Sequence, residues 1–220
     1  ATRVPWEYDV ESPIYTRYTR STDFIPVQNE TVSSTSVRTV GRERNPYSRA
    51  RYVYNLTTSA ISFVEGGPVT PVAVIEAGEG DSLGIAGAYV ALARAAAVPA
   101  RLVGGYRIAA DGTLVNHHWA EFYLPTFGWV PVDPVLGGGA RADEVNAAGV
   151  SDAREYYFGN VDNRRIAMVV DETPIPDLRQ DSTTMLIADG DFWRFGSVEV
   201  VGELPDFAVA PIAPSLLGTY

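Results

Sequence analysis

One segment constrains the fold more than any other, because residues 81–97 can form only a helix that is buried on most of its sides. The segment opens with Asp81 and Ser82, either of which can cap a helix. After them it consists of alanine, glycine and larger apolar residues, with Arg94 as the single charge. A helix without a polar face must be surrounded by other elements, so the sequence predicts a central, buried helix.

The residues after this helix carry the pattern of β-strands. Pro99 ends the helix, and aromatic and β-branched side chains predict strands at residues 101–108, 115–124 and 129–132. The last two strands are joined by residues 125–128 and form a predicted hairpin. One buried helix beside antiparallel strands, without βαβ alternation, indicates an α+β fold.

The N-terminal part of the chain has a different character. Residues 1–44 are rich in Ser and Thr, are interrupted by prolines and show no sustained period, so we expect an extended arm with short strands. Residues 45–135 are predicted to form the core. This core begins with a helix over residues 45–64, capped by Asn45, and continues with a loop over residues 66–80 that is rich in Gly and Pro.

Residues 136–220 are predicted to add strands and a tail that pack on the same domain. A glycine-rich loop comes first, and residues 141–149 have only weak helical character. The later strands are expected at residues 166–170, 184–188 and 198–201. Residues 205–214 contain three prolines and indicate an irregular tail.

Composition excludes several classes of function. The formal charge is −10, and clustered basic side chains supply the affinity of general nucleic-acid binders, so we expect no nucleic-acid partner. No apolar run reaches the roughly 18 residues that a membrane-spanning helix needs. All 17 basic residues are Arg. The chain has no Cys, and this absence excludes disulfides, thiolate metal sites and a cysteine nucleophile. The chain starts at Ala1 without Met or a leader, which indicates a processed or excised piece; an exported location, periplasmic or extracellular, is compatible with it.

The chain has two histidines, and they are adjacent. His117 and His118 lie on a predicted strand, so their side chains leave by opposite faces and cannot bind one metal ion together. We therefore expect neither a metal nor another cofactor. Asp133 follows an apolar run one strand later and would need a partner if buried. A four-residue hairpin loop places Asp133 on the face of His118, whereas a three- or five-residue loop or a bulge selects His117, and spacing alone leaves both open.

Ser82 stands at the start of the buried helix, where backbone N–H groups point outward and the helix dipole is positive. A hydroxyl or thiol at this place can act as a nucleophile, because a developing anion is stabilised there. It can also serve as a plain helix cap. Both interpretations of Ser82 are compatible with the residues alone.

Three motifs in register carry a family resemblance. They are GDSLGIAGAYVALARAAAVPARLVGGY at residues 80–106, NHHWAEFYL at residues 116–124 and GWVPVDP at residues 128–134. Together they resemble the transglutaminase-like core of the papain-like cysteine protease superfamily, over roughly residues 45–134. In that family a Gly-Asp-Cys motif opens a buried helix, and His-x-Trp and Gly-Trp-x-x-x-Asp-Pro follow. The resemblance implies a papain-like core in which the buried helix packs on an antiparallel sheet.

The resemblance also implies roles for individual residues. It places the nucleophile at Ser82, the histidine at His117 and the orienting acid at Asp133, which requires an odd hairpin loop or a bulge. The substrate-binding positions that we expect beside this site are Trp119, Trp129 and His118, although packing in the core is an alternative role for each tryptophan.

The departure from the family is serine in place of the nucleophilic cysteine. A thiol can give its proton to histidine before attack, whereas Ser82 would have to lose its proton during attack, so we expect weak or absent turnover. Three explanations remain open: an engineered inactivation, a natural non-catalytic relative, or a genuine serine enzyme.

The family's chemistry implies acyl transfer at an amide bond, by a peptidase, amidase or protein-glutamine acyltransferase. The implied partners are a peptide or protein substrate and, where transfer replaces hydrolysis, an amine acceptor. The alternative is a non-catalytic peptide-binding or scaffold module on the same fold, and hydrolysis is favoured over crosslinking.

Overall fold

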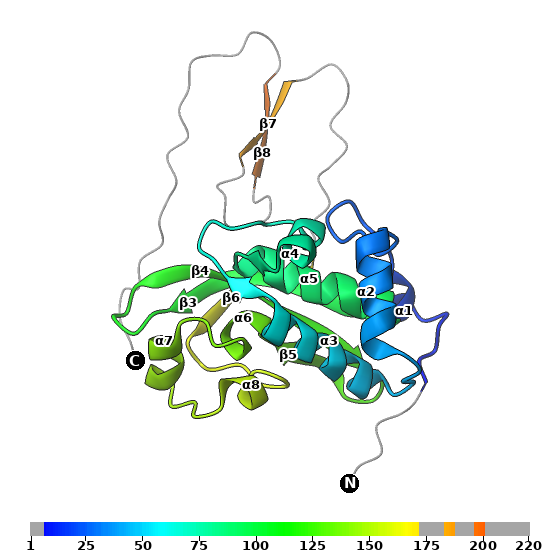
Figure 1. The fold of residues 1–220 in the computed structure, drawn as a ribbon. Helices are drawn as coiled ribbons and strands as arrows, with labels where there is room; N and C mark the ends of the chain where they lie inside the picture. Colours follow the sequence, from blue (N-terminus) through cyan, green and yellow to red (C-terminus); the bar gives the residue numbers. More distant parts are fainter. Residues whose placement is uncertain (1–6, 172–182, 188–195, 201–220) are drawn as a thin grey trace.

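Helix α5 (Ser82–Ala95) lies at the centre of the fold in a computed structural model that describes residues 7–171, 183–187 and 196–200 (Figure 1). Every residue of α5 from Ser82 to Arg94 is buried, as its lack of a polar face predicted. The charge of Arg94 is accommodated because its Nε donates to the carbonyl of Ala100 at 2.8 Å. The sequence prediction of a central buried helix is therefore confirmed.

A four-stranded antiparallel sheet lies against α5. Its strand order is β5-β4-β3-β6, and its strands are β3 (Ala100–Ile108), β4 (Leu114–Leu124), β5 (Gly128–Val132) and β6 (Arg165–Val170). Side chains of β4 at alternate positions, among them Ala120 and Phe122, share one hydrophobic core with Leu92 of α5. This arrangement confirms the α+β fold, with the predicted hairpin formed by β4 and β5.

The hairpin loop has three residues. Leu124 pairs with Gly128, and the ladder continues without a bulge to the pair of Ala120 and Val132. Thr126 in the loop has a φ of 68°, in the left-handed region that such short loops need. One residue beyond the ladder, Asp133 therefore falls on the face of β4 that carries His117.

Three helices cover α5 on the side away from the sheet (Figure 1). They are α2 (Glu30–Val40), α3 (Pro46–Ala60) and α4 (Pro71–Ala77). Helix α3 begins as predicted, since the side chain of Asn45 accepts from the amide of Ser48 and Pro46 occupies the first turn.

The prediction of short strands in the N-terminal arm is wrong. Residues before the core form α1 (Pro13–Tyr18) and α2. Helix α2 contacts α5 through small side chains: Val32 is buried, and Ser36 Oγ donates to the carbonyl of Leu92 at 3.0 Å. Because one of the two buried residues of α2 is the polar Ser36, the apolar period that marks an amphipathic helix is too weak to be recognised in the sequence.

Two boundaries between residues 60 and 80 also differ from the prediction. Helix α3 ends at Ala60, and the next residues form β1 (Ser62–Phe63), which pairs in parallel with β2 (Glu79–Gly80). The predicted loop contains α4, which starts at Pro71 and ends at Gly78 with a φ of 69°. Prolines and glycines here mark the two ends of a short helix and not a continuous loop.

The C-terminal part of the described chain adds short elements. They are α6 (Pro134–Gly137), α7 (Ala142–Ala147), α8 (Ala153–Tyr156), β7 (Thr183–Ile187) and β8 (Gly196–Val200). Strands β7 and β8 pair with each other near their predicted positions. The predicted tail lies outside the described residues, as do the last residues of the predicted strands 184–188 and 198–201.

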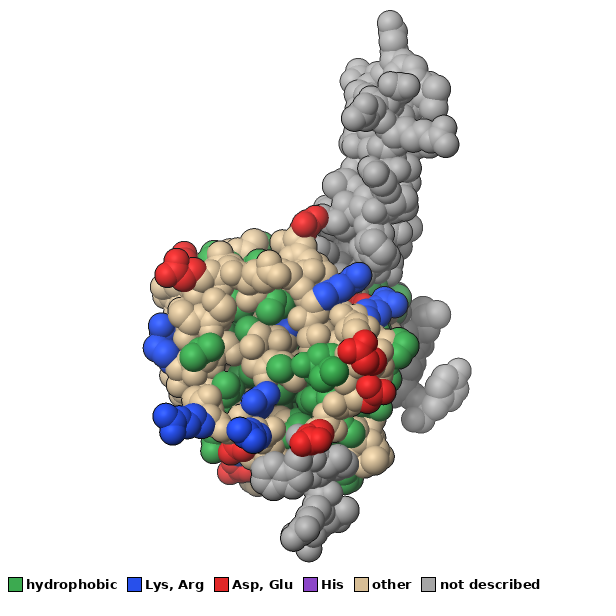
Figure 2. Space-filling model, turned by 90° about the vertical axis from the view of Figure 1, so that its right-hand side faces the viewer, with side chains coloured by type: hydrophobic (Ala, Val, Ile, Leu, Met, Phe, Trp, Pro, Cys, Tyr) green, Lys and Arg blue, Asp and Glu red, His purple; other side chains and the backbone are tan. Residues whose placement is uncertain are grey.

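The surface carries charges of both signs. On the face shown in Figure 2, arginine and acidic side chains are interspersed among apolar and polar ones.

Among the residues described, no helix is both long and apolar enough to cross a lipid bilayer.

Gly105 offers a test of the sheet. A Cβ at this position would lie 2.0 Å from the carbonyl oxygen of Ile166, on the neighbouring strand β6. We expect Gly105→Ala to lower the free energy of unfolding by about 2 kcal/mol, because β3 and β6 must separate to admit it. Urea denaturation measures this loss. Ala110→Gly, which removes one exposed methyl group in the β3–β4 turn, is the control and should change the free energy by less than about 0.5 kcal/mol.

Candidate functional site

Ser82 is the first residue of α5, and it is not the residue that caps the helix. Asp81 is the cap, since its side chain accepts from the amide of Gly84 at 2.8 Å. The hydroxyl of Ser82 instead lies 3.3 Å from Nδ1 of His118. The predicted alternative of a plain cap therefore does not apply to Ser82, whose hydroxyl sits at the positive end of a buried helix beside an imidazole.

Strand β4 presents His118 to Ser82 because of its alternation. Ala120 and Phe122 of β4 pack in the core under α5, and the residue two positions before Ala120 is His118. His118 is 2% exposed and Ser82 is 9% exposed, so their contact is largely screened from water. The buried face of β4 thus fixes which histidine meets the head of α5.

The short parallel pair of β1 and β2 brings a third segment to this place. Phe63 pairs with Gly80, directly before the start of α5. Gly80 must be glycine for this approach, since a Cβ there would lie 2.6 Å from Cγ2 of Val74 and 2.9 Å from the carbonyl oxygen of Pro68. As a result Phe63, Glu65 and Gly66 border the site.

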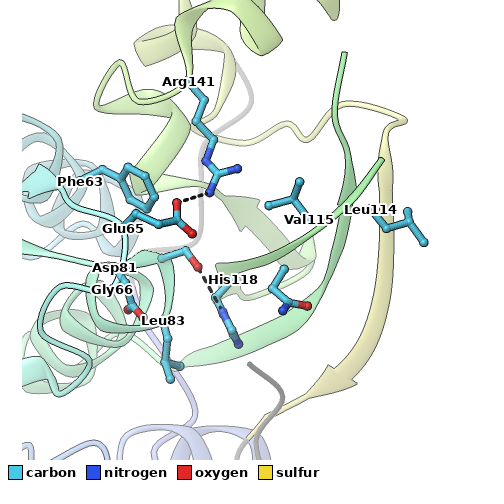
Figure 3. Close-up of a pocket in the computed structure, with 11 residues that line it drawn as sticks. Phe63, Glu65, Gly66, Asp81, Leu83, Leu114, Val115, His118 and Arg141 are labelled. Carbon is cyan, nitrogen blue, oxygen red and sulfur yellow. Dashed lines mark hydrogen bonds and ion pairs between the residues drawn. The ribbon is translucent and has the colours of Figure 1, made fainter. Parts of the chain in front are cut away.

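A cavity of about 470 Å³ opens beside Ser82 (Figure 3). Its polar wall is formed by Glu65, Asp81, Ser82, Asn116, His118 and Arg141. Its volume is in the range of cavities that hold a small molecule or a few residues of a peptide. Within the described parts of the chain, no three His, Cys, Asp or Glu side chains are placed to hold a metal ion.

Asp133 lies on the other face of β4 and binds His117. Its Oδ2 is 2.6 Å from Nε2 of His117, and both side chains are almost completely buried. The other oxygen, Oδ1, accepts from the amides of Val135 and Leu136 at 3.0 Å, so Asp133 also caps α6. The pairing of Asp133 with His117 agrees with the three-residue hairpin loop.

Arg165 supplies the counter-charge of Asp133. Its Nη1 lies 2.6 Å from Oδ2 of Asp133, and its Nη2 lies 3.1 Å from Oδ2 of Asp162. The phenol of Tyr157 donates to the same oxygen of Asp162 at 2.8 Å. Sequence reasoning missed Arg165, Asp162 and Tyr157 in this role. The available signal was that a buried carboxylate after an apolar strand requires a cation, and that Arg165 directly precedes the strand predicted at residues 166–170.

These contacts set the charge state of the pair. Burial acts to raise the pKa of Asp133, but His117 and Arg165 lower it well below its ordinary value. Burial lowers the pKa of His117 and outweighs the opposing effect of Asp133. At neutral pH the pair is therefore a carboxylate and a neutral imidazole, with the positive charge carried by Arg165.

The two predicted tryptophans pack away from the cavity. Trp119 is 4% exposed, stacks on His117 with ring centroids 6.3 Å apart, and lies under the guanidinium of Arg165. Trp129 packs edge-on against Tyr18 and under Arg101, whose Cζ is 4.0 Å from its ring centroid. Neither tryptophan lines the cavity beside Ser82, whereas His118 does.

The predicted residues therefore form two separate pairs on opposite faces of β4. Ser82 contacts His118 on the side of α5, and His117 contacts Asp133 on the side of α6. The resemblance implied one continuous chain from Ser82 through His117 to Asp133. The alternation of a strand explains the difference, since adjacent histidines cannot face the same way without a bulge, and the ladder of β3 with β4, which contains both histidines, has none.

The neutral state of His117 has a measurable consequence. An unfolded histidine has a pKa of about 6.5, so below this pH the unfolded chain binds a proton that folded His117 does not, and the free energy of unfolding falls. We expect His117→Gln to lose unfolding free energy less steeply than the wild type between about pH 7.5 and about pH 5. Urea denaturation at each pH measures both slopes. Equal slopes would contradict a neutral imidazole at His117.

The chain is similar to several known proteins. A protein of Haemophilus influenzae described only as uncharacterised is 28% identical over 151 residues, in a match that covers 55% of this chain and 41% of that protein. A solved structure from Cytophaga hutchinsonii, described as a candidate cysteine protease, has a TM-score of 0.50 at 15% identity and covers 90% of this chain and 60% of that one. The periplasmic domain of TgpA from Pseudomonas aeruginosa has a TM-score of 0.47 at 20% identity, over 57% of this chain and 48% of that one.

The chain thus spans less than half the length of the Haemophilus relative and less than two thirds of either structure. The family model that matches is that of the transglutaminase-like superfamily, over residues 33–134. This match includes α3, α5 with Ser82 at its start, β4 with both histidines, and Asp133. Residues 33–134 of this chain are therefore a transglutaminase-like superfamily domain.

Proposed function

We propose that this chain binds an amide bond of a peptide or protein at the head of α5, in a centre for acyl transfer, and that Ser82 leaves it without turnover. The observation that supports this proposal is the 3.3 Å contact between Ser82 Oγ and His118 Nδ1 beside the cavity. In this proposal His118 is the base. His117 and Asp133 hold β4 and α6 in position around His118.

The chemistry of such a centre begins with attack on an amide carbonyl by the nucleophile at position 82. As the C–N bond breaks, His118 gives a proton to the departing amine. Water or a second amine then attacks the acyl group, restores the nucleophile and releases an acid or a new amide. The first backbone N–H groups of α5, those of Ser82 and Leu83, have no acceptor inside the helix and can stabilise the carbonyl oxygen.

Two features of this chain oppose turnover. A thiol has a pKa of about 8.5 and can lose its proton to an imidazole before attack, but a serine hydroxyl must lose its proton during attack, which needs a well-oriented base. In serine enzymes a carboxylate holds that base. Here the carboxylate of Asp133 is bound to His117 and Arg165, on the other face of β4 from His118. The proposed outcome is binding without catalysis.

The second candidate is a peptide-binding or scaffold module without a usable catalytic pair. The observation that favours it is the engagement of Asp133 away from His118. The two candidates differ in how a thiol at position 82 would behave. A centre for acyl transfer activates such a thiol, and a scaffold leaves it with the reactivity of a free cysteine.

Ser82→Cys is the direct test. The helix N-terminus and His118 should lower the pKa of the introduced thiol, and we expect iodoacetamide to alkylate it about tenfold faster than free cysteine at a pH of about 6.5. Mass spectrometry of the labelled chain gives the rate. Adding His118→Gln should return the rate to that of free cysteine, whereas adding His117→Gln should leave it within about twofold.

Ser59→Cys is the matched control, because Ser59 is exposed at the end of α3. Its thiol should react as a free cysteine does. If the thiol at position 82 reacts no faster than this control, the scaffold candidate replaces the proposal. If His117→Gln slows the labelling and His118→Gln does not, the base has been assigned to the wrong histidine.

The unaltered chain gives a further prediction. A fluorophosphonate probe reacts with a serine whose proton is taken up by an oriented base, so we expect it not to modify Ser82. Peptide mapping by mass spectrometry after long exposure checks this. A stoichiometric adduct on Ser82 would show a working serine enzyme and would contradict the absence of turnover.

A further inference from the structure

We infer that Arg141 binds a carboxylate group of the ligand in this cavity, and that Glu65 occupies the position of that carboxylate until a ligand arrives. The inference rests on the proposed function, because it concerns the ligand of the same cavity. It adds the chemical class of the ligand: a peptide that carries a carboxylate, either at its C-terminus or on an acidic side chain.

The ion pair at the cavity is the first observation. Arg141 Nη2 lies 2.9 Å from Oε2 of Glu65, and both residues line the cavity that contains Ser82 (Figure 3). The side chain of Arg141 is only 15% exposed, whereas that of Glu65 is 80% exposed. An exposed carboxylate contributes little to such a pair, so a ligand carboxylate that is more completely shielded from water can replace it.

The ring of Phe63 is the second observation. The guanidinium carbon of Arg141 lies 5.1 Å from the centre of this ring, which is within the range of a cation–π contact. Phe63 belongs to β1 and is held there by its pairing with Gly80. The ring therefore keeps the guanidinium in place when its carboxylate partner changes, and a pre-positioned guanidinium loses less entropy on binding.

The backbone of Arg141 is the third observation. Its φ is 54°, in the left-handed region that a residue with a Cβ rarely adopts. Glycine would occupy this position without strain, and strained residues that persist are concentrated at ligand sites. Arg141 also follows α6, the helix that Asp133 caps, and the preceding amide of Ala140 donates to the carbonyl of Val135 in α6 at 3.3 Å.

Together these observations describe a cationic subsite in the same cavity as the proposed centre. The carboxylate of Glu65 marks the geometry that a ligand carboxylate would take at Arg141. When such a ligand binds, Glu65 turns into solvent, which its high exposure permits. A ligand whose carboxylate is amidated gains nothing from this exchange.

Calorimetric titration of the unaltered chain with four peptides tests the inference. Acetyl-trialanine with a free C-terminus is compared with its C-terminal amide, and acetyl-Ala-Glu-Ala amide with acetyl-Ala-Gln-Ala amide. We expect at least one carboxylate peptide to bind about tenfold more tightly than its neutral match. The pair that shows the preference tells whether a terminal or a side-chain carboxylate is recognised.

Variants separate Arg141 from general charge effects. Arg141→Gln should remove the preference, and Glu65→Gln should increase the affinity for the carboxylate peptide about threefold, because the side chain of residue 65 then no longer competes with the ligand for Arg141. A gain of affinity cannot arise from misfolding. Arg38→Gln, on the exposed face of α2, is the matched control and should leave the preference unchanged.

Equal binding of acid and neutral peptides to the unaltered chain would overturn the inference and leave the proposed function intact. A preference that survives Arg141→Gln would overturn it as well. Failure of the thiol-labelling test would instead overturn the proposed function, while a carboxylate preference that depends on Arg141 would still stand. If none of the four peptides binds, the inference about Arg141 is overturned, and the proposed function is decided by the thiol-labelling test.

Discussion

The burial of α5 against β4 is the constraint on which the rest of the molecule depends. Because α5 has no polar face, it requires the sheet on one side and α2, α3 and α4 on the other. The same contact sets the orientation of β4, since Ala120 and Phe122 must face the helix. Once they do, His118 faces the head of α5 and His117 faces away. The position of both histidines thus follows from packing of the core.

The two faces of β4 consequently have different electrostatic characters. On the side of α5, Ser82 and His118 border a cavity with mixed polar groups. On the opposite side, Asp133, Arg165 and Asp162 form a buried network whose charges are matched by close contacts. A buried carboxylate without a cation would be costly, which explains why the guanidinium of Arg165 contacts both Asp133 and Asp162. The activity proposed above belongs to the first face only.

Much of the fold could be predicted from the sequence. The helices that could not be predicted were missed for different physical reasons. The apolar composition of α5 and the aromatic strands after it are strong patterns, and the structure confirms them. Helix α2 escaped because its buried contact is made by Ser36 and other small side chains, which give no apolar period. Helix α4 was not predicted, because Pro71 at its start and Gly78 after its end are also typical of loops.

The candidate site was predictable as a set of residues but not as a set of contacts. Ser82, the two histidines and Asp133 were all singled out, yet which histidine meets which partner depends on a hairpin loop whose length differs by one residue between the alternatives. Arg165 was missed because it lies 32 positions after Asp133 and reaches it only through the order of strands in the sheet. Pairings of this kind are decided by topology and not by local pattern.

The position of Asp133 bears on how sequences of this kind are read. Its carboxylate joins β4 through His117, α6 through two backbone amides, and β6 through Arg165. Replacing it would loosen three elements at once, whether or not any reaction takes place. In a chain folded like this one, selection for folding alone would preserve the histidine and aspartate of the motif after loss of the nucleophile. The presence of this histidine and this aspartate in a sequence is then explained by folding. Only the residue at the head of the central helix indicates whether the reaction can take place.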